Sequence, residues 1–191
     1  INGLNKKEKR ITQLISDKKK YDIGDNDIII SSLPINITSK YLGKENKLKY
    51  RGICSVYLFY NKNYILPRNQ HWLYFDSEFL LFNRITENKK LSNFVAPKNK
   101  SFLTAEITYS AGDKFSKLKP ELIMNKVKTQ IEETGIINNK HLLGTSINFE
   151  PFVYPVQFSD YKSEVARVKS FVESFAYGHQ LLFDHQLRFV C

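Results

Sequence analysis

The sequence is poor in the residues that build the commonest catalytic and metal-binding motifs. Its 191 residues include 8 glycines and 2 cysteines, and neither the G-x-G-x-x-G nor the P-loop pattern occurs. Cys54 lies within the apolar run GICSVYLFY, where a thiol behaves as a small apolar side chain, and Cys191 is the last residue. We therefore expect no structural disulfide, no zinc site and no cysteine nucleophile.

Long apolar runs are missing as well. No stretch approaches the roughly 18 apolar residues of a membrane-spanning helix, and no secretory signal is visible. These absences predict a cytoplasmic protein with no transmembrane segment. The sequence begins with INGLNKKEKR, which resembles the interior of a protein, and we interpret the chain as a fragment.

The remaining ionisable side chains form no evident catalytic set. The four histidines are scattered, and the nearest pair, His179 and His185, would lie about 20 Å apart on an extended strand. Glu132 and Glu133 are adjacent on a predicted helix and point to different sides. We therefore do not expect these residues to form a complete enzyme by themselves.

Basic charge is the main excess. The net charge is +10, and 23 of the 29 basic residues are lysine. Such surfaces attract polyanions, but phosphate recognition favours the planar fork of arginine. We therefore interpret the lysines as solvated surface and disfavour a nucleic-acid partner. The densest lysine cluster flanks a predicted hairpin, Arg10 to Ser16 and Tyr21 to Ile23.

Hydrophobic patterning predicts an α+β (α/β-like) fold. Ile28 to Ile30 has no polar alternation, which predicts a strand covered on both faces, followed by a helix at Ile35 to Tyr41. Further strands are predicted at Tyr50 to Tyr60, in HWLYF and FLLFNRI around a turn at Asp76 to Glu78, at Ser101 to Ser110, and in HLLGTSINFE as far as Pro151. Two main helices are predicted: one begins at Pro120, with Leu122, Ile123, Val127 and Ile131 on its buried face, and the other spans Tyr161 to Phe175. We expect a mixed sheet of about six strands.

Two residues are poorly explained by packing alone. Arg84 ends an apolar strand before a long polar loop, and Tyr154 ends another strand beside Pro155. A surface arginine and an ordinary turn tyrosine are the simpler interpretations.

Several segments carry a family resemblance when they are read in order. They are NDIIISSLPI, HWLYFDSEFLLFNRITENKKLS, LTAEITYSAGDKF and PFVYPVQF. Between Arg10 and Phe175 the chain resembles flavin-containing amine oxidoreductases. The nearest branch is the protoporphyrinogen-oxidase-like group, which is associated with UDP-galactopyranose mutase and lipopolysaccharide biosynthesis.

The resemblance implies a division of roles along the chain. Residues 1–34 would be part of the FAD-binding domain, 35–155 the substrate-binding domain, and 156–191 a return helix with a divergent end. Ser31, Ser32 and Pro34 would contact FAD, and Arg84 and Tyr154 would bind an anionic small-molecule substrate. The family's G-x-G-x-x-G motif is absent, so we expect the chain to be inactive alone and to need the missing FAD-binding half, from the same or a partner chain.

A second interpretation comes from a different class of protein. The basic excess is also compatible with a non-enzymatic α/β module that binds an anionic partner, either a nucleotide sugar or a nucleic acid. A charge reversal in the segment Lys6 to Lys20 would separate the two, because only the second predicts a large, salt-sensitive loss of polyanion binding.

Overall fold

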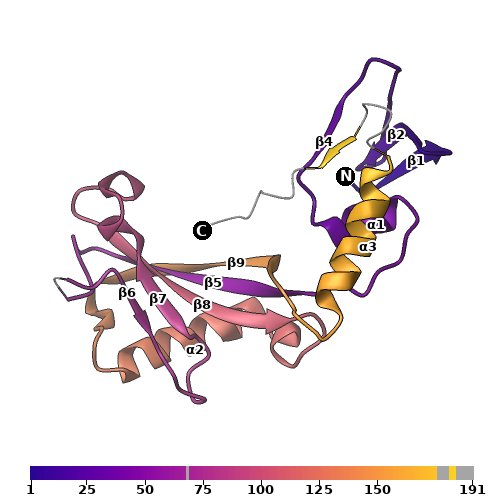
Figure 1. The fold of residues 1–191 in the computed structure, drawn as a ribbon. Coiled ribbons are helices and arrows are strands. Elements are labelled where there is room, and N and C mark those ends of the chain that lie inside the picture. Colours follow the sequence, from indigo (N-terminus) through magenta and orange to yellow (C-terminus); the bar gives the residue numbers. More distant parts are fainter. Residues whose placement is uncertain (68, 176–180, 184–191) are drawn as a thin grey trace. The chain divides into compact units, whose positions relative to one another are not determined.

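The computed structural model describes residues 1–67, 69–175 and 181–183 (Figure 1). The chain divides into two compact units. Residues 1–49 and 155–191 form the first, which we call the flanking unit, and Tyr50–Tyr154 forms the second, the sheet unit. The assignment of chain segments to cofactor and substrate roles stays a prediction.

The sheet unit is built on a five-stranded antiparallel sheet with the order β6-β7-β8-β5-β9. Its strands are β5 (Tyr50–Tyr60), β6 (Trp72–Tyr74), β7 (Arg84–Glu87), β8 (Ser101–Ser110) and β9 (Leu142–Pro155). β5 and β8 pair along their whole length, with Arg51 opposite Ser110 and Tyr60 opposite Ser101. Both strands are rich in β-branched and aromatic residues, which favour this extended pairing.

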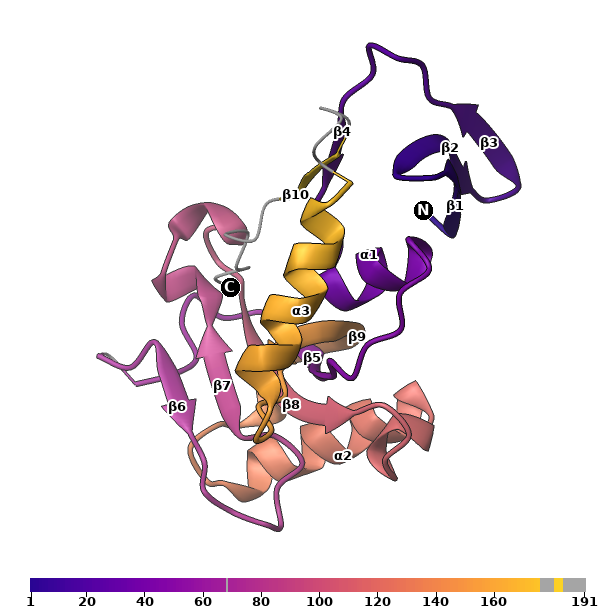
Figure 2. The same cartoon turned by 45° about the vertical axis from the view of Figure 1, so that its right-hand side comes forward.

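One face of this sheet carries the core of the unit. Side chains alternate along β5, so that Cys54, Val56 and Leu58 are buried on the same face. The helix α2 (Pro120–Glu133) lies along that face (Figure 2). It buries Ile123, Val127 and Ile131 against the sheet. The predicted helix is confirmed, but Leu122 is 57% exposed and does not belong to its buried face.

The flanking unit contains a second antiparallel sheet and two helices. The sheet consists of β1 (Gly3–Lys7), β2 (Arg10–Ser16) and β3 (Lys19–Asp22), in that order. The helices α1 (Ile35–Tyr41) and α3 (Tyr161–Glu173) share a hydrophobic cluster with β2. The predicted hairpin of β2 and β3 is confirmed, and β1 was missed because the sequence GLNKK shows no apolar alternation.

Two predictions about strands are wrong. β4 (Ile29–Ser31) pairs in parallel with β10 (Leu181–Phe183), and Ile28 and Ile30 are 64% and 72% exposed instead of covered on both faces. The predicted mixed sheet of about six strands is an antiparallel sheet of five strands, and the other strands of the described residues form separate sheets of three and two. Apolar composition alone predicted burial, but it does not say how many neighbouring strands are available.

Smaller differences lie at the ends of elements. β9 continues through Pro151 to Pro155, and β6 and β7 are shorter than HWLYF and FLLFNRI, with a longer connection between them than Asp76 to Glu78. Four short 3₁₀ helices complete the described elements: η1 (Asn88–Lys90), η2 (Asn93–Val95), η3 (Phe115–Lys117) and η4 (Asn139–His141). Among the described helices, none combines the length and the apolar character that a membrane crossing requires.

Candidate functional site

The face of the five-stranded sheet opposite α2 is the candidate site. α2 is the single α-helix described within the sheet unit, and it covers only the core face (Figure 1). The strand register places the other set of alternating side chains on what we call the open face. This face carries Ser55, Tyr57, Phe59, Trp72, Tyr74, Arg84, Thr86, Phe102, Thr104 and Glu106.

Arg84 is held in place at the centre of one row across the open face. Its register partners are Tyr74 on β6 and Glu106 on β8. The guanidinium Nη2 donates to Glu106 Oε2, and Nη1 donates to the Tyr74 hydroxyl at 3.2 Å. Burial opposes the charge, but the hydrogen bonds to Glu106 and Tyr74 raise the pKa of Arg84 above its ordinary value. The guanidinium therefore stays charged.

Arg84 retains capacity for a further ligand. Two of its five N–H groups are engaged by these bonds, and its Nε is buried without a hydrogen-bond partner among the described residues. One N–H group on each of Nη1 and Nη2 therefore remains for a ligand. Glu106 neutralises the local charge, so an anion bound at this row would be held by directed N–H groups and not by net charge. Asn83 donates to Thr108 at 3.3 Å and Asn88 to Thr104 at 2.7 Å, which extends the polar surface along both strands.

The structure does not bring Arg84 and Tyr154 together. Tyr154 lies near the end of β9, at the edge of the sheet, and is 47% exposed. β7 and β9 are three strand spacings apart, which is about 14 Å across the sheet. The two side chains therefore cannot hold the same small anionic group, although each stays a candidate by itself.

The predicted cofactor residues lie in the flanking unit. The Ser31 hydroxyl is 3.3 Å from the Thr38 hydroxyl, and Ser32 is exposed. Pro34 precedes α1, and its carbonyl accepts from the Thr38 amide at 3.0 Å. Ser31 and Pro34 thus each use a polar atom in a contact with Thr38 of α1. The Ser32 hydroxyl is therefore the most accessible of the three predicted cofactor contacts.

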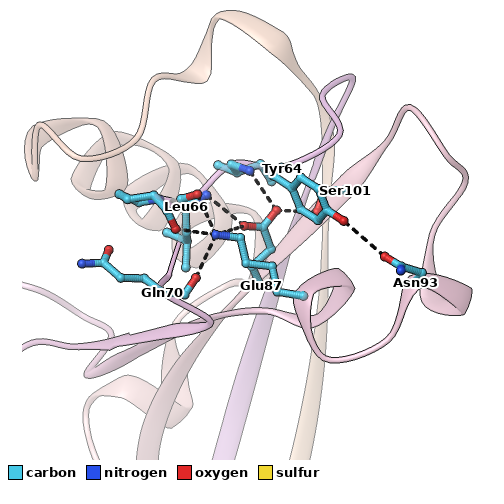
Figure 3. A network of polar contacts seen from close by, with 9 residues as sticks. Tyr64, Leu66, Gln70, Glu87, Asn93 and Ser101 are labelled. Carbon is cyan, nitrogen blue, oxygen red and sulfur yellow. Dashed lines mark hydrogen bonds and ion pairs between the residues drawn. The ribbon is translucent and has the colours of Figure 1, made fainter.

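A buried polar network near β7 was missed by the sequence analysis (Figure 3). The Glu87 carboxylate is fully buried and accepts from the amides of Ile65 and Leu66 and from the Ser101 hydroxyl, at 2.7 to 2.9 Å. The Lys90 ammonium lies 3.7 Å from Glu87. In the sequence, ENKK looks like an ordinary solvated charge run, and no periodic pattern distinguishes it.

Two lysines of this network bind backbone carbonyls. Lys90 donates to the carbonyls of Leu66, Pro67 and Gln70. Lys89 is 3% exposed and donates to the carbonyls of Pro97, Lys98 and Lys100 at 2.6 to 2.7 Å. An ammonium has three donors, and all three are engaged in each case. The cavity of about 710 Å³ beside them is therefore lined by cations that have no donor left for an anion.

Cys54 is chemically inert, as the sequence predicts. It is fully buried, and burial raises the pKa of its thiol to about 12. Such a thiol is not a nucleophile near neutral pH. Within the described residues, no group of histidine, cysteine, aspartate and glutamate side chains could hold a metal ion.

The fold resembles that of two solved structures, while the sequence matches no family model and no curated protein. One is reduced UDP-galactopyranose mutase, with a TM-score of 0.66 and 14% identity over 90% of this chain and 37% of that one. The other is a provisional protoporphyrinogen oxidase from Exiguobacterium sp. 255-15, with a TM-score of 0.68 and 15% identity over 95% of this chain and 40% of that one.

These likenesses establish the fold and its extent. The chain has the fold of part of these proteins and spans about two fifths of their length. The resemblance to flavin-containing amine oxidoreductases is thereby confirmed at the level of fold. Cytoplasmic location and a role in lipopolysaccharide biosynthesis stay predictions.

Proposed function

We propose that this chain is the substrate-binding portion of an FAD-dependent oxidoreductase or nucleotide-sugar mutase, and that the open face contacts the substrate. The likeness to an oxidase and to a mutase over 90 to 95% of the chain supports this proposal. In this scheme the chain supplies position and electrostatics, and redox chemistry belongs to the flavin. Alone, the chain is inactive.

The observation that carries the proposal is the fixed guanidinium of Arg84. Glu106 and Tyr74 hold it from both sides, so its remaining N–H groups point in directions that are set before a ligand arrives. Preorganised donors lower the ordering cost of binding. Arg84 is thus suited to a carboxylate or phosphate of the substrate, while Tyr154 would serve a separate contact.

The residues of this chain do not make a complete FAD site. A dinucleotide pyrophosphate normally sits on a glycine-rich turn at a helix N-terminus. The sequence lacks that motif, and α1 has 7 residues and follows a proline. We infer that Ser31, Ser32 and Pro34 add at most peripheral contacts to a flavin that another segment or a partner chain holds. No reaction step is assigned to them.

Trp72 offers a direct test, because it is the single tryptophan and lies half-exposed on the open face. We expect titration of the full chain with UDP-galactopyranose or protoporphyrin IX to change Trp72 fluorescence with saturation for at least one ligand. Arg84→Gln should weaken that binding by at least tenfold, since a charge-assisted bidentate contact is lost. Arg84→Lys should be intermediate, because lysine keeps the charge but not the fork.

The control for this experiment is Lys126→Gln, which removes a positive charge from an exposed side chain on α2, away from the open face. It should leave binding unchanged. Far-ultraviolet and near-ultraviolet circular dichroism establishes that each variant is folded. The proposal is wrong if neither ligand gives a saturable signal, or if Arg84→Gln and Lys126→Gln behave alike in folded protein.

A further inference from the structure

A second recess lies on the open face, at the end opposite Asn83. It has a volume of about 420 Å³, within the range of small-molecule sites. We call it the aromatic pocket. Its main lining residues are Tyr57, Phe59, Phe102, Val95, Pro97 and Leu143. Phe59 lies four residues along β5 from Ser55, the register partner of Glu106, and is about 13 Å from the row of Arg84, whereas Tyr57 lies two residues from Ser55, about 7 Å from that row.

The floor of the aromatic pocket is a group of rings. Phe59 and Phe102 are register partners with ring centres 6.0 Å apart, and Tyr57 contacts Phe102 at 6.2 Å. Phe59 is 40% exposed and Leu143, from the edge strand β9, is 56% exposed. An uncovered aromatic surface of this kind stabilises flat apolar groups that remove it from water.

The wall of the pocket is fixed from behind. Val95 is the last residue of η2, Ala96 and Pro97 follow it, and the buried ammonium of Lys89 binds the carbonyls of Pro97, Lys98 and Lys100. The Ser92 hydroxyl accepts from the Phe94 amide and starts η2. Because three charge-assisted bonds hold this loop, the pocket does not have to form when a ligand binds.

The charge of the pocket is one-sided. Lys100 lines it and is exposed, and its ammonium has no hydrogen bond or ion pair to the residues that the structure describes. The lining residues include no aspartate or glutamate. Lys89, by contrast, is saturated by carbonyls. A ligand with a negative group at its edge would therefore find one free cation beside an aromatic floor.

We infer that the aromatic pocket binds a flat, ring-containing organic anion. Its rings lie against Phe59 and Phe102, and its carboxylate, or an equivalent anionic group, lies at the ammonium of Lys100. This site uses neither Arg84 nor a flavin, so it extends beyond the proposed function, and variants of its lining residues separate it from the contact at Arg84.

The test is a nuclear magnetic resonance titration of the full ¹⁵N-labelled chain with 2-naphthoate. We expect saturable shifts centred on the amides of Phe59, Phe102 and Leu143. Phe59→Ser should weaken binding about tenfold, since one side of the ring contact is lost. Leu143→Ser provides a second lining variant on another strand. Leu122→Ser is the matched control, because Leu122 is equally exposed but lies on α2.

The role of Lys100 is tested by comparing 2-naphthoate with the uncharged compound 2-naphthalenemethanol. Lys100→Gln should weaken 2-naphthoate about two- to fivefold, the range of an exposed ion pair, and should not affect 2-naphthalenemethanol. Lys126→Gln, which removes an exposed ammonium from α2, should leave both affinities unchanged. The inference is overturned if shifts do not saturate, if they are spread over the whole chain, or if both lining variants match the control. Equal binding of the two compounds would overturn the role of Lys100.

Discussion

At the scale of single residues, the buried carboxylate of Glu87 is important for the stability of the sheet unit. Its carboxylate accepts three hydrogen bonds inside the sheet unit and faces the ammonium of Lys90 (Figure 3). Glu87→Gln keeps the volume but places an amide N–H₂ against N–H donors. We expect the free energy of unfolding in urea to fall by about 3 kcal/mol, as for a broken buried pair. A loss no greater than in Glu78→Gln, an exposed glutamate, would contradict this.

Glu164 in the flanking unit makes stability depend on pH. Hydrogen bonds from Arg167, and then from the Lys47 amide, lower the pKa of Glu164 from 4.5 to about 2. A lowered folded-state pKa contributes stability that is present above the unfolded value and is lost as pH falls through the folded one. We therefore expect stability to decline between about pH 4.5 and pH 2.

Glu164→Gln tests this dependence. The variant should be less stable than the natural sequence near pH 6 and should show a flatter decline in urea midpoint below pH 4.5. Glu173→Gln is the control, because its pair with Lys169 is exposed and exposed pairs contribute little. Parallel pH profiles for Glu164→Gln and the natural sequence would show that Glu164 is not the titrating group.

At the scale of elements, Gly52 sets how closely β5 approaches its neighbours. A Cβ at this position would lie 2.6 Å from the Tyr109 ring and 2.7 Å from the Glu150 carbonyl oxygen. Gly52→Ala must therefore displace β8 or β9, and we expect a loss of about 1–3 kcal/mol in urea unfolding. Gly144→Ala, with open space around its Cβ, should change little. If both substitutions were equally tolerated, the close packing around Gly52 would not be rigid.

Elements with a strong period were predictable from the sequence. β5 and β8 alternate, and α2 and α3 carry apolar stripes, so local pattern and tertiary burial agree. The prediction that β4 is covered on both faces was wrong because a run of isoleucines does not reveal how many strands or helices lie beside it. Arg84 was singled out as the end of a strand, which is wrong, because it is the first residue of β7. Its partners Tyr74 and Glu106 come from other strands. The pairing register of the strands brings these three residues together, and that register cannot be read from their spacing in the sequence.

The lysines of η1 illustrate a different limit. Lys89 and Lys90 belong to a charge run that composition assigns to solvent, yet both bind backbone carbonyls of separate loops. The wall of the aromatic pocket depends on that arrangement. A residue's burial is decided here by which loops pass nearby, so neither the network nor the pocket could be predicted from the local sequence.

At the scale of the whole molecule, the net charge of +10 bears on the choice between the two functional classes. The basic segment at the start of the chain is interspersed with acids, and Arg10 forms an ion pair with Asp25. Lys18, Lys19 and Lys20 are exposed at the turn and start of β3, where like charges also discourage pairing with another strand. The structure thus supplies an explanation of these lysines that needs no polyanion.

Reversing all three charges, Lys18→Glu, Lys19→Glu and Lys20→Glu, should therefore have little specific effect. We expect weak oligonucleotide binding at low salt that disappears near physiological ionic strength and falls to a similar extent in a matched triple reversal elsewhere. The matched reversal replaces the exposed lysines Lys119, Lys126 and Lys128 with glutamate. Fluorescence anisotropy of a labelled single strand measures both. A much larger, salt-sensitive loss of oligonucleotide binding in the Lys18, Lys19 and Lys20 variant would favour the basic binding module over the flavoprotein fragment. Two clusters of three lysines carry the same charge, so their reversal can differ in effect only if one cluster belongs to a localised polyanion site.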